Sequence, residues 1–94
     1  MLTEMVVYGR PGCNYCIQAI ELLKDAKINY KYVNVWEDTN AKQFLVNQGL
    51  KTVPQIFVTE DKETRIGGFE ELVIHLEDRG LIDVNIITRL HLHH

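Results

Sequence analysis

The two cysteines of this chain are the residues best suited to chemistry. Cys13 and Cys16 are separated by Asn14 and Tyr15 and follow a short apolar segment. Because residues three apart lie on one face of a helix, two sulfurs at this spacing can reach each other as a dithiol or as a disulfide. The spacing therefore predicts a reversible redox pair.

The two sulfurs are expected to differ in reactivity. A thiol at a helix start faces unpaired backbone N–H groups and the positive end of the helix dipole, which favour the thiolate. Such sites lower a cysteine pKa from about 8.5 to between roughly 3.5 and 7.5, and Arg10 adds positive charge nearby. We therefore expect Cys13 to be an exposed nucleophile. Cys16, one turn inside the helix, is expected to be a shielded resolving thiol.

The alternative of a structural zinc site is weaker. Zinc in proteins usually takes four ligands, and neither a second cysteine pair nor a well-spaced cysteine and histidine pair completes the set. No bound metal is expected, and the terminal histidines are given no function. Trp36 and Phe44 are interpreted as packing residues.

Length and charge limit the remaining classes of function. The chain has 94 residues, with 13 acidic against 10 basic side chains. This length predicts one domain over 1–94, with its core at about 5–80. The acidic balance argues against a nucleic-acid binder and favours a small-molecule or protein partner. Neither a secretory signal nor a membrane-spanning run is recognised, so we expect a cytoplasmic protein, where a lone Cys-x-x-Cys is usually catalytic or metal-binding.

The first half of the chain predicts two parallel strands joined by the helix that carries the cysteines. The strands are expected at 5–8 and 30–36, with apolar residues at helical spacing between them over 14–26. A helical crossover makes neighbouring strands parallel. Asp38 or Thr39 is expected to cap a second helix that ends near Gly49.

The second half predicts an antiparallel hairpin followed by a helix. Strands are expected at 55–58 and 64–66, joined by a polar turn at 60–63. A helix over 70–79 places Leu72, Val73 and Leu76 inward, and 81–94 is expected to form a short helix or a tail. The whole is an α/β arrangement, one four-stranded mixed β-sheet flanked by three or more helices.

Three separated motifs stand in the order and spacing of glutaredoxins, and the chain resembles that family over about 5–80. They are Cys13-Asn14-Tyr15-Cys16, Thr52-Val53-Pro54 and Gly67-Gly68-Phe69-Glu70-Glu71. The resemblance implies a thioredoxin-like fold and a glutathione-dependent enzyme that reduces protein disulfides and glutathione mixed disulfides. Asn14 stands where dithiol glutaredoxins commonly carry proline, which affects the expected redox potential rather than the chemistry.

The resemblance also implies a place for the middle of glutathione, which acts as co-substrate. It makes the Val53–Pro54 peptide bond cis and turns it toward the cysteines. The free backbone of Val53 is then expected to pair with the cysteinyl unit of glutathione, as an added strand does. Thr52 flanks this contact, and Tyr15 borders the groove.

The two ends of glutathione carry charge and need partners. By resemblance, the helix start after Gly68 offers the N–H groups of Phe69 and Glu70 to the γ-glutamyl carboxylate. Glu71, or with less support Glu70, is expected to hold the amino group. The glycyl carboxylate needs a cation, and two basic residues adjoin the motifs, Arg10 and Lys51.

Other uses of the same residues stay open at this point. A thioredoxin-like donor recharged by a flavoprotein reductase would share the fold and the cysteines, although Tyr15, Gly67-Gly68 and Glu71 count against it. An iron–sulfur cluster carrier would hold its cluster through Cys13 and glutathione. A redox-regulated interaction protein would show no turnover. The expected partners are glutathione and disulfide-containing or glutathionylated proteins, with ribonucleotide reductase a client that the resemblance suggests, and the chain is expected to be a monomer.

Overall fold

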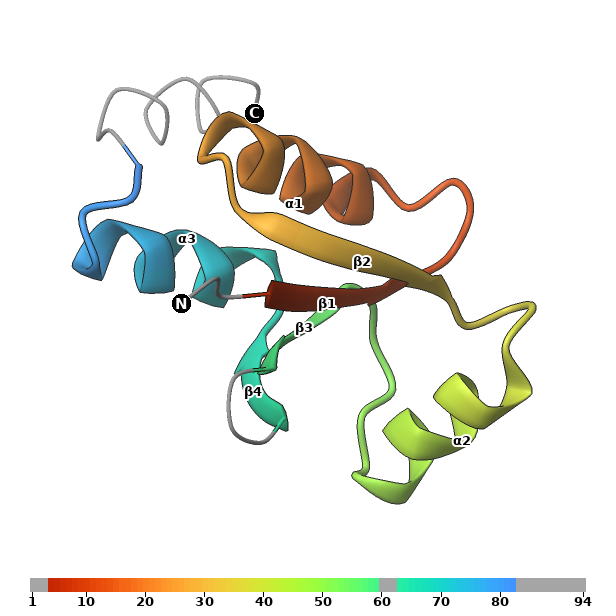
Figure 1. Ribbon diagram of the computed structural model, residues 1–94. Helices are drawn as coiled ribbons and strands as arrows, with labels where there is room; N and C mark the ends of the chain where they lie inside the picture. The colour runs from red at the N-terminus through yellow and green to blue at the C-terminus, as the bar shows by residue number, and fades with distance from the viewer. Residues whose placement is uncertain (1–3, 60–62, 83–94) are drawn as a thin grey trace.

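The part of the chain that the structure describes contains four strands and three helices, in the order predicted from the sequence (Figure 1). The computed structural model describes residues 4–59 and 63–82. Of the turn predicted at 60–63, residues 60–62 lie outside the described residues, and Glu63 is the first residue of a strand. Of the tail predicted at 81–94, residues 83–94 also lie outside them. The elements are β1 (Glu4–Gly9), α1 (Asn14–Asp25), β2 (Asn29–Asn34), α2 (Thr39–Asn47), β3 (Gln55–Thr59), β4 (Glu63–Gly67) and α3 (Phe69–Asp78).

The strands form one mixed sheet in the order β2-β1-β3-β4. β1 pairs with β2 in parallel, as the α1 crossover predicts, and with β3 in antiparallel. β3 and β4 form the predicted antiparallel hairpin, with an irregularity in register between Ile56 and Phe57. The N-terminal strand therefore lies inside the sheet and joins its parallel and antiparallel parts.

The helices cover both faces of the sheet, with α1 and α3 on one face and α2 on the other (Figure 1). Successive strand residues point to opposite faces, so β1 supplies both cores. Met5 and Val7 pack with α1 and α3, including the predicted inward residues Leu72, Val73 and Leu76. On the other face, Tyr8, Phe44 and Phe57 form an aromatic cluster with ring centroids 5.4 to 5.5 Å apart. Phe44 is thus a packing residue, as predicted.

Local capping contacts fix where the helices begin. The Sγ of Cys13 accepts a hydrogen bond from the backbone N–H of Cys16 at 3.2 Å, so α1 begins directly after Cys13. Asp38 caps α2 by accepting the N–H of Ala41 at 3.0 Å, which confirms one of the two predicted caps. No helix in the described part of the chain is long and apolar enough to cross a membrane.

Candidate functional site

The two cysteines form a disulfide within the first turn of α1. Their Cα atoms are 5.2 Å apart, within the range that a disulfide spans. The Sγ of Cys13 also lies 3.9 Å from the backbone carbonyl oxygen of Val53. A sulfur in a disulfide has no proton to donate, so this contact becomes an S–H···O hydrogen bond only when Cys13 is a thiol. The predicted redox pair is therefore present and faces the predicted loop.

The expectation of an exposed Cys13 is wrong for the disulfide form. Cys13 is 5% exposed and Cys16 is 2% exposed, so both residues are buried. Cys13 is the N-cap of α1, and its side chain folds back over the first turn while the Val53 loop lies on its other side. The two sulfurs differ in what surrounds them more than in how much of each residue is exposed.

The loop before β3 carries the predicted cis peptide bond, between Val53 and Pro54. Pro54 is buried and Val53 is half-buried, so the loop is anchored next to the disulfide. Behind it, the buried Gln55 donates from Nε2 to the backbone oxygen of Thr52 at 3.1 Å and to its Oγ1 at 3.2 Å. Arg65 completes this support by donating from Nε to Oε1 of Gln55 at 3.0 Å.

Gln55 and Arg65 were not predicted as parts of the site. Gln55 is 3% exposed, and it is the buried polar residue of the described chain. A buried amide needs hydrogen-bond partners, and Gln55 finds them in the Thr52 loop and in β4. The signal in the sequence was a glutamine at the start of an otherwise apolar strand.

A small cavity of about 210 Å³ brings together most of the residues predicted to bind glutathione. The ring of Tyr15 is half exposed and lies 5.8 Å from the ring of Phe69, at an interplanar angle of 31°. The cavity thus joins the first turn of α1, the loop before β3 and the start of α3. Its lining consists of Tyr15, Thr52, Val53, Pro54, Gly68, Phe69, Glu70 and Glu71.

Glu71 has a structural contact that the sequence did not predict. Its Oε1 accepts the backbone N–H of Gly68 at 2.7 Å, which holds the turn that enters α3. The preceding Gly67 has φ +130°, and a Cβ there would lie 2.8 Å from Cγ of Glu71. One carboxylate oxygen of Glu71 is therefore engaged, while Glu70 is exposed beside the same cavity.

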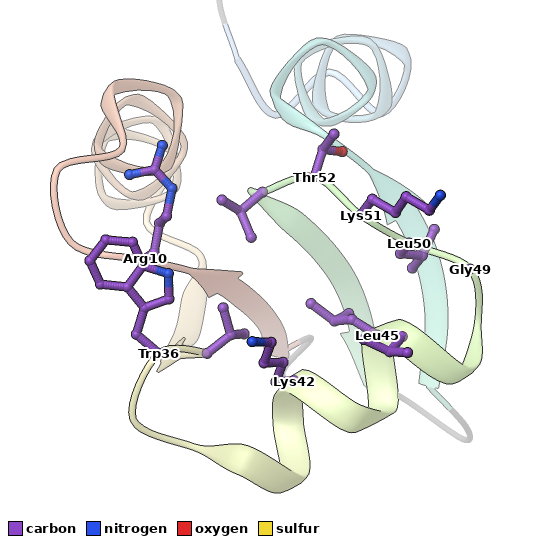
Figure 2. A pocket seen from close by; sticks show the side chains of 11 residues that line it. Arg10, Trp36, Lys42, Leu45, Gly49, Leu50, Lys51 and Thr52 are labelled. Atoms are coloured by element: carbon purple, nitrogen blue, oxygen red, sulfur yellow. The ribbon is translucent and has the colours of Figure 1, made fainter.

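A larger groove of about 420 Å³ lies on the α2 side of the same loop (Figure 2). It brings together the two cations predicted for the glycyl carboxylate, Arg10 and Lys51, and adds Lys42 from α2, which was not predicted. Among the described residues that line the groove, none is acidic. Thr52 and Val53 line both this groove and the small cavity, so the two hollows adjoin at the loop beside Cys13.

Trp36 lies at this groove, and its interpretation as a packing residue is wrong. The side chain is 66% exposed, and its ring lies 5.6 Å below the guanidinium carbon of Arg10 (Figure 2). Trp36 stands two residues after Asn34, the last residue of β2, and its backbone N–H donates to Oδ1 of Asn34 at 2.9 Å. This turn directs the ring out of the sheet, where it orients Arg10 by a cation–π contact.

The fold and the disulfide together define a class of protein, the thioredoxin-like thiol–disulfide oxidoreductases. The solution structure of a glutaredoxin from Brucella melitensis matches with a TM-score of 0.64 and 29% identity, covering 84% of this chain and 83% of that one. A buckwheat glutaredoxin–glutathione complex matches with a TM-score of 0.65, covering 93% and 78% of the two chains, and at 22% identity it shows the fold alone.

The sequence comparisons identify the family. The glutaredoxin family model matches residues 5–62. A glutaredoxin of Vibrio cholerae is 35% identical over 88 residues, covering 84% of this chain and 98% of the relative. Glutaredoxin 1 of Salmonella typhimurium is 38% identical over 71 residues, covering 67% and 78% of the two chains. The chain therefore belongs to the glutaredoxin family.

Proposed function

We propose that this protein is a dithiol glutaredoxin of the Cys-x-Tyr-Cys type, which uses glutathione to reduce protein disulfides and glutathione mixed disulfides. The observation that carries the proposal is the position of Val53. Its backbone lies beside the Cys13 sulfur, and it lines both the small cavity and the larger groove. An extended tripeptide centred on Val53 would have one end in each hollow.

Each hollow has groups that suit one end of glutathione. The start of α3 offers the N–H groups of Phe69 and Glu70, which have no acceptor within the helix, to the γ-glutamyl carboxylate. Glu70, or the second oxygen of Glu71, would take the amino group. In the larger groove, Arg10 or Lys51 would take the glycyl carboxylate. A buckwheat protein of the same fold has been crystallised as a complex with glutathione, which supports the choice of ligand.

Reduction of a glutathione mixed disulfide would begin at Cys13. Its thiolate attacks the glutathione sulfur, a new disulfide forms between Cys13 and glutathione, and the protein substrate leaves as a thiolate that takes a proton from water. A second glutathione thiolate then attacks the glutathione sulfur bound to Cys13. This releases oxidised glutathione and restores the Cys13 thiolate, for which the N–H of Cys16 is already in place.

Reduction of a protein disulfide would need both cysteines. The Cys13 thiolate forms a mixed disulfide with the substrate, and the thiolate of Cys16 attacks Cys13 to release the reduced substrate. The Cys13–Cys16 disulfide is then reset by two glutathione molecules. Ribonucleotide reductase is a proposed client of this second route.

Serine substitution of each cysteine tests the proposal. We expect Cys13→Ser to abolish reduction of both a glutathione mixed disulfide and a protein disulfide, because it removes the nucleophile. We expect Cys16→Ser to keep the first activity and lose the second, because only the second needs a resolving thiol. The measurement is the glutathione-dependent rate on each substrate, with the unsubstituted protein as control.

Two results would contradict the proposal. If Cys16→Ser kept both activities, Cys16 would have no part in the mechanism. If a thioredoxin reductase with NADPH reduced the disulfide form while glutathione did not, the protein would be a thioredoxin-like donor instead.

A further inference from the structure

The sulfur of Cys16 lies against the parallel pair of strands, over a glycine. A Cβ built on Gly9 would lie 2.9 Å from Sγ of Cys16 and 3.2 Å from its Cβ. The same Cβ would lie 3.0 Å from Cε1 of Tyr32. Real Cβ atoms essentially never come closer than 3.0 Å to another atom and seldom come within 3.4 Å, so the Cys16 sulfur and the edge of the Tyr32 ring occupy the space that a side chain on Gly9 would need.

The strand register explains this meeting. Tyr32 pairs with Val7 in the β1–β2 ladder, and Val7 points into the core under α1. Residues two apart share a face of a strand, so Gly9 and Tyr32 both face the helix that carries Cys16. Cys16 is 2% exposed, whereas Tyr32 is 37% exposed and belongs to the edge strand β2, so Tyr32 is the solvent-facing one of the two side chains beside Gly9.

The two sulfurs of the disulfide therefore have different surroundings. Cys13 adjoins the carbonyl of Val53, which lines both hollows of the site. The Cys16 sulfur and the Tyr32 ring share the space beside Gly9, and among the described residues that line the groove and the small cavity there is neither Gly9 nor Cys16 nor Tyr32. Burial raises the pKa of the Tyr32 hydroxyl, and the negative charge of Glu37 raises it further, so the hydroxyl stays protonated at neutral pH.

We propose that Tyr32 is a positioning residue whose ring covers the sulfur of Cys16, so that an incoming thiolate can reach the disulfide only at Cys13. The proposal extends the function proposed above by assigning the direction of reductive attack to a residue outside the two hollows. The attacking thiolate bonds to Sγ of Cys13, and the Cys13–Cys16 bond breaks. Its electron pair passes to Sγ of Cys16, which then takes a proton from water.

The test measures the reactivity of each sulfur alone, without glutathione or a client protein. In a Cys13→Ser background, Cys16 is the one thiol, and its rate of reaction with Ellman's reagent reports access to it. We expect Tyr32→Val to raise this rate about tenfold, because the thiol no longer depends on a local opening of the ring. Tyr32→Phe keeps the ring and should leave the rate within about twofold of the background.

The Cys16→Ser variant distinguishes loss of a local cover over Cys16 from a general loosening of the fold by Tyr32→Val. With Cys16→Ser, Cys13 is the one thiol, and Tyr32→Val should leave its rate within about twofold, because Cys13 faces the Val53 loop instead. If Tyr32→Val fails to fold by circular dichroism, Tyr32→Thr keeps a β-branched side chain and replaces it. An unchanged Cys16 rate in the truncated variant would overturn the proposal. So would equal increases at both cysteines, or a Tyr32→Phe variant as reactive as Tyr32→Val.

Because the assay contains no glutathione, its outcome does not depend on the proposed co-substrate. If the Tyr32 variants showed no change in the reactivity of Cys16, the activities expected of Cys13→Ser and Cys16→Ser under the proposed function would be unaffected. Conversely, if the protein showed no glutathione-dependent turnover, the rate at which Cys16 reacts with Ellman's reagent would still test whether Tyr32 covers it.

Discussion

Gly9, which lies beneath Cys16, allows the stability cost of adding one methyl group to be predicted. Gly9 lies at the end of β1, its position is closed by Cys16 and Tyr32, and it is absent from the positive-φ residues of the described chain. In Gly9→Ala, the added methyl group is therefore crowded by Cys16 and Tyr32, but the backbone at this position is not strained. Inserting a methyl group into a packed position costs about 1–3 kcal/mol.

An opposing effect reduces this cost. Alanine restricts the unfolded chain more than glycine does, which stabilises a compatible site by about 0.4–1 kcal/mol. The closest contact, 2.9 Å to the sulfur of Cys16, is with an atom fixed in a disulfide, so it cannot turn away as a free side chain would. We therefore expect Gly9→Ala to lower the free energy of unfolding by about 1 kcal/mol, because a mid-range crowding cost of about 2 kcal/mol is opposed by a mid-range backbone gain of about 0.7 kcal/mol.

Urea unfolding of the disulfide form, followed by circular dichroism, measures this change. A loss of 1 kcal/mol corresponds to a fall in Tm of about 4–8 °C for a domain of this size. The matched control is a double-mutant cycle with Tyr32→Val, which should recover part of the loss because it removes one of the two crowding groups. A Gly9→Ala variant as stable as the parent, or more stable, would refute the reasoning, because it would show that the site relaxes at no cost.

Two further substitutions test single contacts. Glu71→Ala removes the acceptor of the Gly68 N–H, so we expect the free energy of unfolding in urea to fall by about 1 kcal/mol, as for other lost N-terminal caps. Glu71→Gln keeps an acceptor and should lose less stability. Equal losses in the two variants would contradict the capping role of Glu71. Tyr32 has a raised pKa in the folded state, so its contribution to stability is present below an unfolded pKa of about 10 and is lost as the pH rises through the folded value. The parent should therefore lose more stability than Tyr32→Phe between about pH 9 and pH 11, and parallel losses would count against the shift.

The sequence was sufficient for the order of elements and for the direction of each strand. The helix between β1 and β2 fixes their parallel pairing, and the short polar link fixes the β3–β4 hairpin. The cis bond before Pro54 was implied by the motif rather than by the residues, because proline alone is equally suited to starting a strand. The residues around the small cavity were likewise foreseen because three motifs occur together.

The sequence was insufficient wherever a side chain depends on a turn or on a distant strand. The sequence favours a packing role for Trp36, but the turn after β2 directs its ring outward, where the guanidinium of Arg10 lies over it. Lys42 lies in an ordinary helix and reaches the groove only through the placement of α2. No sequence pattern near Cys13 predicts its burial, because the burial depends on the distant Val53 loop. Likewise, no local pattern places Tyr32 and Cys16 together beside Gly9, because that arrangement depends on the pairing of β1 with β2.

The position of β1 inside the sheet makes the redox centre a product of assembly. The segment through β2 carries the cysteines, and the segment from the Thr52 loop onward carries the cis proline and the start of α3. Among the described residues, the two segments meet in the sheet only through the β1–β3 ladder, from Met5 opposite Val58 to Tyr8 opposite Gln55. Neither segment holds a complete site. The redox activity of the cysteines therefore depends on the pairing of β1 with β3, and a measurement of that activity also reports whether the two segments have come together.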